Sequence, residues 1–352
     1  MAVVLVEGFD AYNGITGNAG SPSAGGWVLG SPTYTALAAG RFGGQAFSKG
    51  SSTVASAWLY KVFGSITQGC LGFALKVTTY TTATSGCLVY LTTDNLSSQL
   101  ALRVGTSGEI SIGRASGTVS DGLGTVLGTT ASNLVTLNTW CYIEMEFVIS
   151  DSVGSINLYV NGTNVLSLSN VDTKANATLS TVNTLYLGDT SSTSGRGVCL
   201  YDDIYVTDTP TRLGEQRIET LYPSADTAQL QWTPSTGSNN YGTVDETLMS
   251  NTDYVSAGTV SNYDLYDFTN LSSTPTSISA ITINALAQKD NAGTRAIALP
   301  VKSSSTTSDG ANNYLAAGWT VLNRIIETDP NTSTAWTASS VNALQAGIKV
   351  TI

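Results

Sequence analysis

Histidine is absent from this sequence of 352 residues, and charged residues are scarce. Without imidazole, the Ser-His-Asp and Cys-His catalytic arrangements, histidine-ligated zinc and histidine acid–base chemistry are excluded. Charged residues make up 11% of the chain, against about a quarter in an average domain. The net charge is −10, and Lys and Arg form no basic stripe. Phosphate backbones need clustered positive charge, so we expect no nucleic-acid partner.

Long apolar runs and paired cysteine motifs are also missing. No run approaches the length needed to span a bilayer, so we expect no membrane partner. The opening MAVVLVEGFD has no positive n-region and reaches Glu7 after a short apolar run, which favours a first strand over a secretion signal. The cysteines include no C-x-x-C pair, so they predict buried thiols in strands, with one disulfide as the alternative. They are Cys70, Cys87, Cys141 and Cys199.

Ser, Thr, Asn and Gly supply the polarity that charge does not, and they favour short strands and turns over helices. Alternation of apolar and polar residues predicts a series of strands separated by Gly, Ser, Asn or Asp. Two hairpins are expected within it, over 70–93 and 140–162, with Gly154 and Gly162 as turn residues of the second. The predicted strands are 3–8, 46–48, 57–63, 70–78, 87–93, 101–104, 110–113, 134–137, 140–150, 155–161, 164–168, 184–187 and 198–206.

The pattern changes at TDTPTRLGEQRIETLYPSAD, where charge is concentrated between Pro210 and Pro223. We interpret residues 209–226 as a linker between domains 1–208 and 227–352. In the second domain, strands 280–289 and 294–302 are expected to form a hairpin. TASSVNALQAG predicts one short helix, with Thr337 or Ser339 as N-cap and Gly347 as its stop, followed by a last strand.

Many short strands without intervening helices predict an all-β fold. We expect an N-terminal antiparallel jelly-roll sandwich, followed by a smaller β-sandwich domain with one short helix near the C-terminus. Low charge on broad β surfaces also favours contact with sister molecules, because few ions must be desolvated. A homo-oligomer is therefore expected.

The run WCYIEMEFVI…GSINLYVNGTNVLSL…LYLG…YDDIYVTD resembles the central part of the laminin-G-like, or concanavalin-like, jelly roll of bacteriophage virion proteins. The second domain, with QLQWTPSTGSNNYGTVDET and DPNTSTAWTASSVNALQAGIKV, is similar to the C-terminal half of phage structural proteins. The resemblance implies a protein of the virion, made in the host cytoplasm without a signal peptide. Its anchors are Trp140, Tyr159, Asn161, Gly162, Gly188, Asp202, Asp203 and Tyr205.

Candidate sites are few. Glu144 and Glu146 share a strand face, which suits a glycosidase pair, but related jelly-roll glucanases carry a third acid where this chain has Val148. We therefore interpret the two acids as a solvated or interface-facing edge. Three further acids, Asp189, Asp202 and Asp203, are calcium candidates, although no D-x-D-x-D-G loop is present and no cofactor is otherwise expected. Aromatic side chains offered to a sugar or partner are Trp27, Trp58, Trp140 and Tyr142.

These observations together predict a non-enzymatic structural component of a tailed-phage virion. It would act in assembly and display as a head decoration, head fibre, tail accessory or tail fibre subunit, a choice that the sequence leaves open. Other capsid or tail proteins are the expected partners, docked through a C-terminal strand that adds to a neighbour's sheet edge. The docking candidates are Trp336, Ile348, Val350 and Ile352. The alternative is a carbohydrate-binding adhesin for host-surface glycan, and the third class is a polysaccharide hydrolase.

Overall fold

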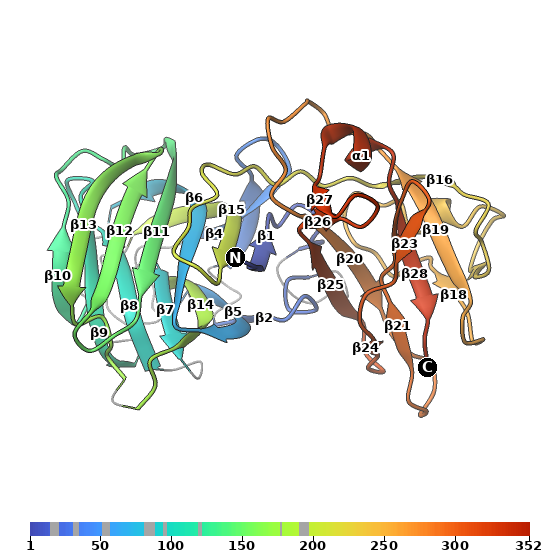
Figure 1. Cartoon of the computed structure of the whole chain (residues 1–352), viewed down its shortest axis with the longest axis horizontal. Coiled ribbons are helices and arrows are strands. Elements are labelled where there is room, and N and C mark those ends of the chain that lie inside the picture. The colour runs from blue at the N-terminus through green and yellow to red at the C-terminus, as the bar shows by residue number, and fades with distance from the viewer. Residues whose placement is uncertain are drawn as a thin grey trace. The chain divides into compact units, whose positions relative to one another are not determined.

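Antiparallel β-strands are the main secondary structure of the chain, as the alternating sequence predicts (Figure 1). The computed structural model describes residues 1–14, 21–30, 35–50, 57–80, 89–93, 97–118, 122–176, 178–189 and 197–352. Its strands fall into two units, and each unit is discontinuous in sequence. The first unit comprises Met1–Asp10 and Gly26–Ile218, and the second comprises Ala11–Gly25 and Glu219–Ile352.

The first unit is a two-layer antiparallel sandwich, which confirms the all-β expectation. One layer, sheet A, has the order β13-β12-β11-β6-β15-β4-β3, with β1 also paired to β15. Its strands are β1 (Val3–Glu7), β3 (Thr35–Ala39), β4 (Gln45–Lys49), β6 (Gln68–Thr79), β11 (Trp140–Val148), β12 (Gly154–Val160), β13 (Thr163–Val171) and β15 (Val198–Thr207).

The second layer, sheet B, has the order β10-β9-β8-β7-β14-β5-β2. Figure 1 shows its strands behind those of sheet A at the left of the view. The strands are β2 (Trp27–Leu29), β5 (Ala57–Ile66), β7 (Val89–Thr93), β8 (Ser97–Val104), β9 (Ile110–Thr118), β10 (Thr125–Thr129) and β14 (Val182–Asp189). Between the sheets lies an apolar core, to which alternate residues of strands such as β1 and β12 contribute.

The predicted hairpin over 140–162 is confirmed. In it, β11 pairs with β12 from Ile143 opposite Val160 to Val148 opposite Ser155. Burial alternates strictly along β12, because one face meets the core and the other does not. Gly162 has φ +78 in the turn to β13, a conformation that favours glycine.

The predicted hairpin over 70–93 is wrong. Strand β6 pairs with β11 and β15 in sheet A, whereas β7 pairs with β14 and β8 in sheet B. The reason is that a sandwich can send consecutive strands to opposite layers, and both strands are apolar enough for either. Cys87 lies outside the described residues. The other three cysteines are free and buried, as expected of small apolar thiols, and the predicted strand 134–137 is irregular chain.

The second unit contains one seven-stranded sheet and three two-stranded sheets. The large sheet contains β16 (Pro223–Asp226), β19 (Tyr263–Phe268), β21 (Ala296–Ala298), β22 (Val301–Ser303), β23 (Thr306–Ser308), β24 (Asn313–Tyr314) and β28 (Gln345–Val350). The small sheets pair β17 (Thr233–Pro234) with β18 (Val255–Ser256), β20 (Ile281–Ala287) with β25 (Thr320–Ile326), and β26 (Thr328–Asp329) with β27 (Thr334–Ala335). A 3-10 turn, η1 (Tyr241–Thr243), and a helix, α1 (Ala338–Asn342), complete the unit.

Helix α1 begins as predicted and ends earlier. Thr337 is the N-cap, and its side chain forms a capping box with Ser340. Gly347 does not stop the helix but lies within β28, where a Cβ atom would come within 2.0 Å of the Asp264 carbonyl oxygen. The predicted hairpin of 280–289 with 294–302 is also wrong, because β20 pairs with β25 and β21 with β24 and β28. Among the described residues, no helix is long and apolar enough to cross a membrane.

The chain passes between the units at three places, whereas the sequence suggested one linker. The described residues on either side of 15–20 group with the second unit, where the Ala11 and Ala24 carbonyl oxygens accept hydrogen bonds from the Met249 and Val321 amides. Residues 209–218 group with the first unit, and residues 223–226 form β16 of the second. A fragment cut at a single boundary would therefore lack part of its unit, and the experiments below use the full chain.

The second unit depends on Asp264, a fully buried carboxylate on β19. It accepts hydrogen bonds from the Gln231 and Trp232 amides, the Asn240 side-chain amide and the Tyr266 hydroxyl, at 2.5 to 2.9 Å. We predict that Asp264→Ala lowers the free energy of unfolding by about 3 kcal/mol, because it leaves buried donors without an acceptor. Denaturant titration of the full chain measures this change. The matched control Asp290→Ala, at an exposed position, should stay within about 0.5 kcal/mol; equal effects of the two substitutions would contradict the assignment.

Candidate functional site

Residues 209–218, called the strap below, cover part of the outer face of sheet A. Glu144, on β11, lies under the strap and is only 1% exposed. Its carboxylate accepts hydrogen bonds from the Tyr205 hydroxyl at 2.6 Å and the Gly214 amide at 2.9 Å. The Arg212 guanidinium forms an ion pair with it at 2.8 Å. A buried carboxylate surrounded by three donors is a structural anchor, because its charge is fully compensated where it lies.

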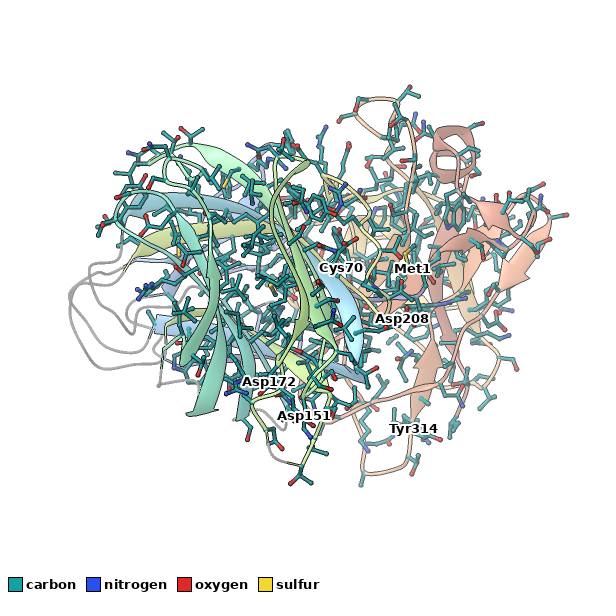
Figure 2. The ribbon with its side chains drawn as sticks, turned by 60° about the vertical axis from the view of Figure 1, so that its left-hand side comes forward. Met1, Cys70, Asp151, Asp172, Asp208 and Tyr314 are labelled. Atoms are coloured by element: carbon teal, nitrogen blue, oxygen red, sulfur yellow. The ribbon has the colours of Figure 1, made fainter. Side chains whose placement is uncertain are left out.

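The rest of the strap packs on apolar and aromatic side chains of sheet A. Leu213 contacts a buried cluster of Cys70, Ala74, Tyr142 and Tyr205, and Figure 2 labels Cys70 within it. The Leu213 amide donates to the Tyr205 hydroxyl at 3.0 Å. Burial raises the pKa of the Cys70 thiol to about 12, so this cysteine is a neutral core residue and not a nucleophile.

The interpretation of Glu144 as part of a solvated or interface-facing acidic edge is therefore wrong, because the strap of the same unit covers it. The charge concentration in TRLGEQR is the signal for this contact, although charge between two prolines is also typical of a linker. Glu146, the second acid of the pair, lies at the rim of the strap. It accepts hydrogen bonds from the Asn157 side-chain amide at 3.1 Å and the Tyr159 hydroxyl at 3.5 Å.

Two of the four aromatic candidates are buried within the first unit. Tyr142 is 1% exposed and donates its hydroxyl proton to the Asp203 carbonyl oxygen at 3.0 Å. Trp27 is equally buried, and its indole N–H donates to Glu7 at 2.7 Å. Neither ring can stack on a sugar, because protein atoms already surround both faces. Trp140 is half-buried against the same cluster as Tyr142.

Trp58, the fourth candidate, belongs to an aromatic row on the outer face of sheet B. Its ring stacks on Tyr60 with a centroid distance of 5.6 Å, and Tyr60 contacts Tyr186 at 4.6 Å. Tyr186 lies directly opposite Tyr60 and Tyr90 in the sheet. Buried Tyr90 and Tyr186 form a small core there, and half-buried Trp58 and Tyr60 pack against it. This row explains the aromatic residues of β5 by packing.

The calcium candidates Asp202 and Asp203 hold backbone in place. The carboxylate of Asp202 accepts hydrogen bonds from the Arg41 amide at 2.7 Å and the Asp203 amide at 2.8 Å. The Asp203 carboxylate accepts one from the Ile218 amide at 2.7 Å, which fixes the end of the strap. Its other oxygen lies 3.6 Å from the Arg41 guanidinium. Together the two acids join β15 to the β3–β4 turn and to the strap.

Burial raises the pKa of both acids. For Asp202 the pKa is about 8, and the neighbouring charge of Asp203 adds to the effect of burial. For Asp203 it is about 6, since the Ile218 amide and Arg41 oppose the effect of burial. Among the described residues, no group of three or more His, Cys, Asp or Glu side chains is arranged to hold a metal ion. The third calcium candidate, Asp189, ends β14, and its side chain lies outside the described part of the structure.

The docking candidates lie in the second unit. Strand β28 is paired with β19 on one side and with β21 and β22 on the other. The expectation that it adds to a partner's sheet is therefore wrong, because the backbone groups of Ile348 and Val350 face paired neighbours. Trp336 is buried in the core of this unit and donates its indole N–H to the Ile326 carbonyl at 3.0 Å. Ile352, after the strand, is exposed.

Comparisons with known proteins find no family, and they find solved structures that are similar only at low identity. No protein-family model and no curated protein matches the chain. Similar solved structures include the alginate lyase Aly36B, at 12% identity and a TM-score of 0.38, over 60% of this chain and 98% of the lyase. A carbohydrate esterase from Shiga toxin-encoding bacteriophage phi24B shares 15% identity at a TM-score of 0.35, over 57% and 98% of the two chains. The lectin UEA-II, solved with galactose, shares 10% identity at a TM-score of 0.36, over 58% and 99%.

We predict that Glu144→Ala lowers the free energy of unfolding by about 3–5 kcal/mol, because it leaves a buried hydroxyl and part of a guanidinium without their acceptor. Limited proteolysis should then cut within the strap, and denaturant titration measures the loss. Glu146→Ala is the control on the same strand face, where a partly exposed carboxylate contributes less than about 1 kcal/mol. An uncut strap in the Glu144 variant would show that the carboxylate does not hold it.

A pH dependence follows from Asp202. The folded protein keeps a proton on this carboxyl up to about pH 8, whereas the unfolded chain loses it near the ordinary value of 3.8. Since the folded state binds more protons in this window, the free energy of unfolding should fall as pH rises from about 4 to about 8. Denaturant titrations at several pH values should show a shallower fall in Asp202→Asn. Identical pH profiles for the two proteins would contradict the raised pKa.

Proposed function

We propose that this protein is a non-enzymatic structural component of a tailed-phage virion, which acts in particle assembly and surface display. The observation that carries the proposal is the burial of Glu144 against Arg212 and Tyr205. Glu144, one acid of the pair that would suit hydrolysis, instead anchors the strap, so its charge is used to hold structure. The jelly-roll resemblance and the low charge of the chain support the same function.

Docking in this proposal belongs to the second unit, through exposed apolar side chains and not through β28. Large apolar residues that reach solvent there can be buried against a neighbouring subunit, which contributes roughly 25 cal/mol per Å² of apolar area. Tyr314 is the most exposed of them at 67%, and Figure 2 labels it on this unit. The set is Leu230, Leu248, Tyr254, Val260, Tyr314 and Ile352.

Quantitative mass spectrometry of purified particles tests the proposal. We predict that the protein co-purifies with particles at a fixed copy number, high for a head decoration and low for a tail part. Tyr314→Ser combined with Val260→Ser should reduce incorporation while the variant stays folded. The control Val153→Ser, at an equally exposed apolar position of the first unit, should leave incorporation unchanged. Absence of the wild-type protein from particles would refute the proposal.

A carbohydrate-binding adhesin is the second candidate function. It is favoured by a polar patch beside the strap, made of Glu146, Asn157, Tyr159 and Arg212. Within the described part of the chain, these side chains retain donors and acceptors that no neighbour uses. Binding of the full chain to a glycan array tests this candidate independently of particle assembly.

A further inference from the structure

We propose that the polar patch, Glu146, Asn157, Tyr159 and Arg212, is a binding site for adjacent hydroxyl groups of a neutral sugar. The proposal rests on the adhesin candidate and names its site and ligand class. The patch lies on the outer face of sheet A, where Glu146 sits opposite Asn157 and Glu144 opposite Tyr159 in the β11–β12 pair.

The Arg212 guanidinium is held in place from two directions. Glu144 binds its Nη1 atom from beneath, and the guanidinium carbon lies 3.7 Å from the centre of the Tyr159 ring. The side chain remains 28% exposed. A planar guanidinium fixed by an ion pair and an aromatic ring loses little conformational entropy when it binds a ligand. Its Nε and Nη2 donors have no hydrogen-bond acceptor among the described residues.

Glu146 and Asn157 provide acceptors beside these donors. One Glu146 oxygen accepts from Asn157 and Tyr159, and the other has no donor in the described part of the structure. The Asn157 amide uses one of its two N–H groups in that bond and leaves its carbonyl oxygen unused, so it can both donate and accept. A sugar hydroxyl also donates and accepts, and two adjacent hydroxyls span neighbouring side chains on a rigid strand pair. The unused groups of the patch therefore match a sugar ring edge.

Charge favours a neutral ligand over an acidic one. Two carboxylates, Glu146 in the patch and Glu144 beneath it, lie near the single guanidinium of Arg212, so these three side chains together carry one net negative charge. The chain as a whole carries −10. An acidic polysaccharide or a nucleic acid would be repelled on approach, whereas a neutral glycan would not.

The test is binding of the full chain to an array of neutral oligosaccharides, with uronic-acid oligosaccharides printed beside them. Hits are followed by calorimetric titration with the soluble neutral oligosaccharide. Asn157→Ala and Glu146→Gln each remove unused hydrogen-bonding groups at half-buried positions, and we expect each to weaken binding by about tenfold. Glu109→Gln, in the connection between β8 and β9 of sheet B, is the matched control and should bind as the wild type does.

The possible results separate the site, the ligand class and the adhesin candidate from one another. Neutral glycan binding that both variants weaken supports the site and its ligand class. Neutral glycan binding that neither variant weakens overturns the site and leaves the adhesin candidate in place. Binding to uronic-acid oligosaccharides alone overturns the ligand class. Binding to no glycan refutes both the site and the adhesin candidate, but it leaves the virion proposal to the particle measurement.

Discussion

Buried carboxylates that accept hydrogen bonds from irregular backbone are the interaction on which this structure depends. Glu144 holds the strap through the Gly214 amide, Asp203 holds its end through the Ile218 amide, and Asp264 holds the Gln231 and Trp232 amides in the second unit. Backbone outside strands has no ladder partner, so each such segment needs another acceptor. Several of the 25 acidic residues of the chain hold backbone in this way. The few charges of this sequence therefore have structural roles.

The same constraint explains where the sequence was informative. Alternation over β11 and β12 predicts their pairing, because one face of each strand must reach the core. The helix start at Thr337 follows from local capping chemistry. The pairing partners of β6 and β20 could not be predicted from the sequence. An apolar strand fits either layer of a sandwich, and the turn residues alone do not determine which layer it joins. No local signal indicates that Ala11 and Ala24 bond to the second unit.

At the candidate sites, the sequence indicates which side chains could bind or react, but it does not indicate which of them are buried. The sequence indicates Glu144 as an acid on a strand face, Asp202 as a calcium candidate and Tyr142 as an aromatic ring for a ligand. Whether each of them meets water depends on a segment far away in sequence. The sequence does not indicate the role of Arg212 in the site, because charge between two prolines is typical of a linker. Its partner lies 68 residues earlier, on β11, and nothing local to either residue indicates the contact.

If the acids are anchors, the strap is part of the folded sandwich and not a tether. Hydrogen exchange of the strap amides in the native full chain tests this most directly. The account predicts that the Leu213, Gly214 and Ile218 amides, which donate to side chains at 2.7 to 3.0 Å, exchange as slowly as neighbouring strand amides of β15. Exchange at the rate of an exposed loop would contradict the account.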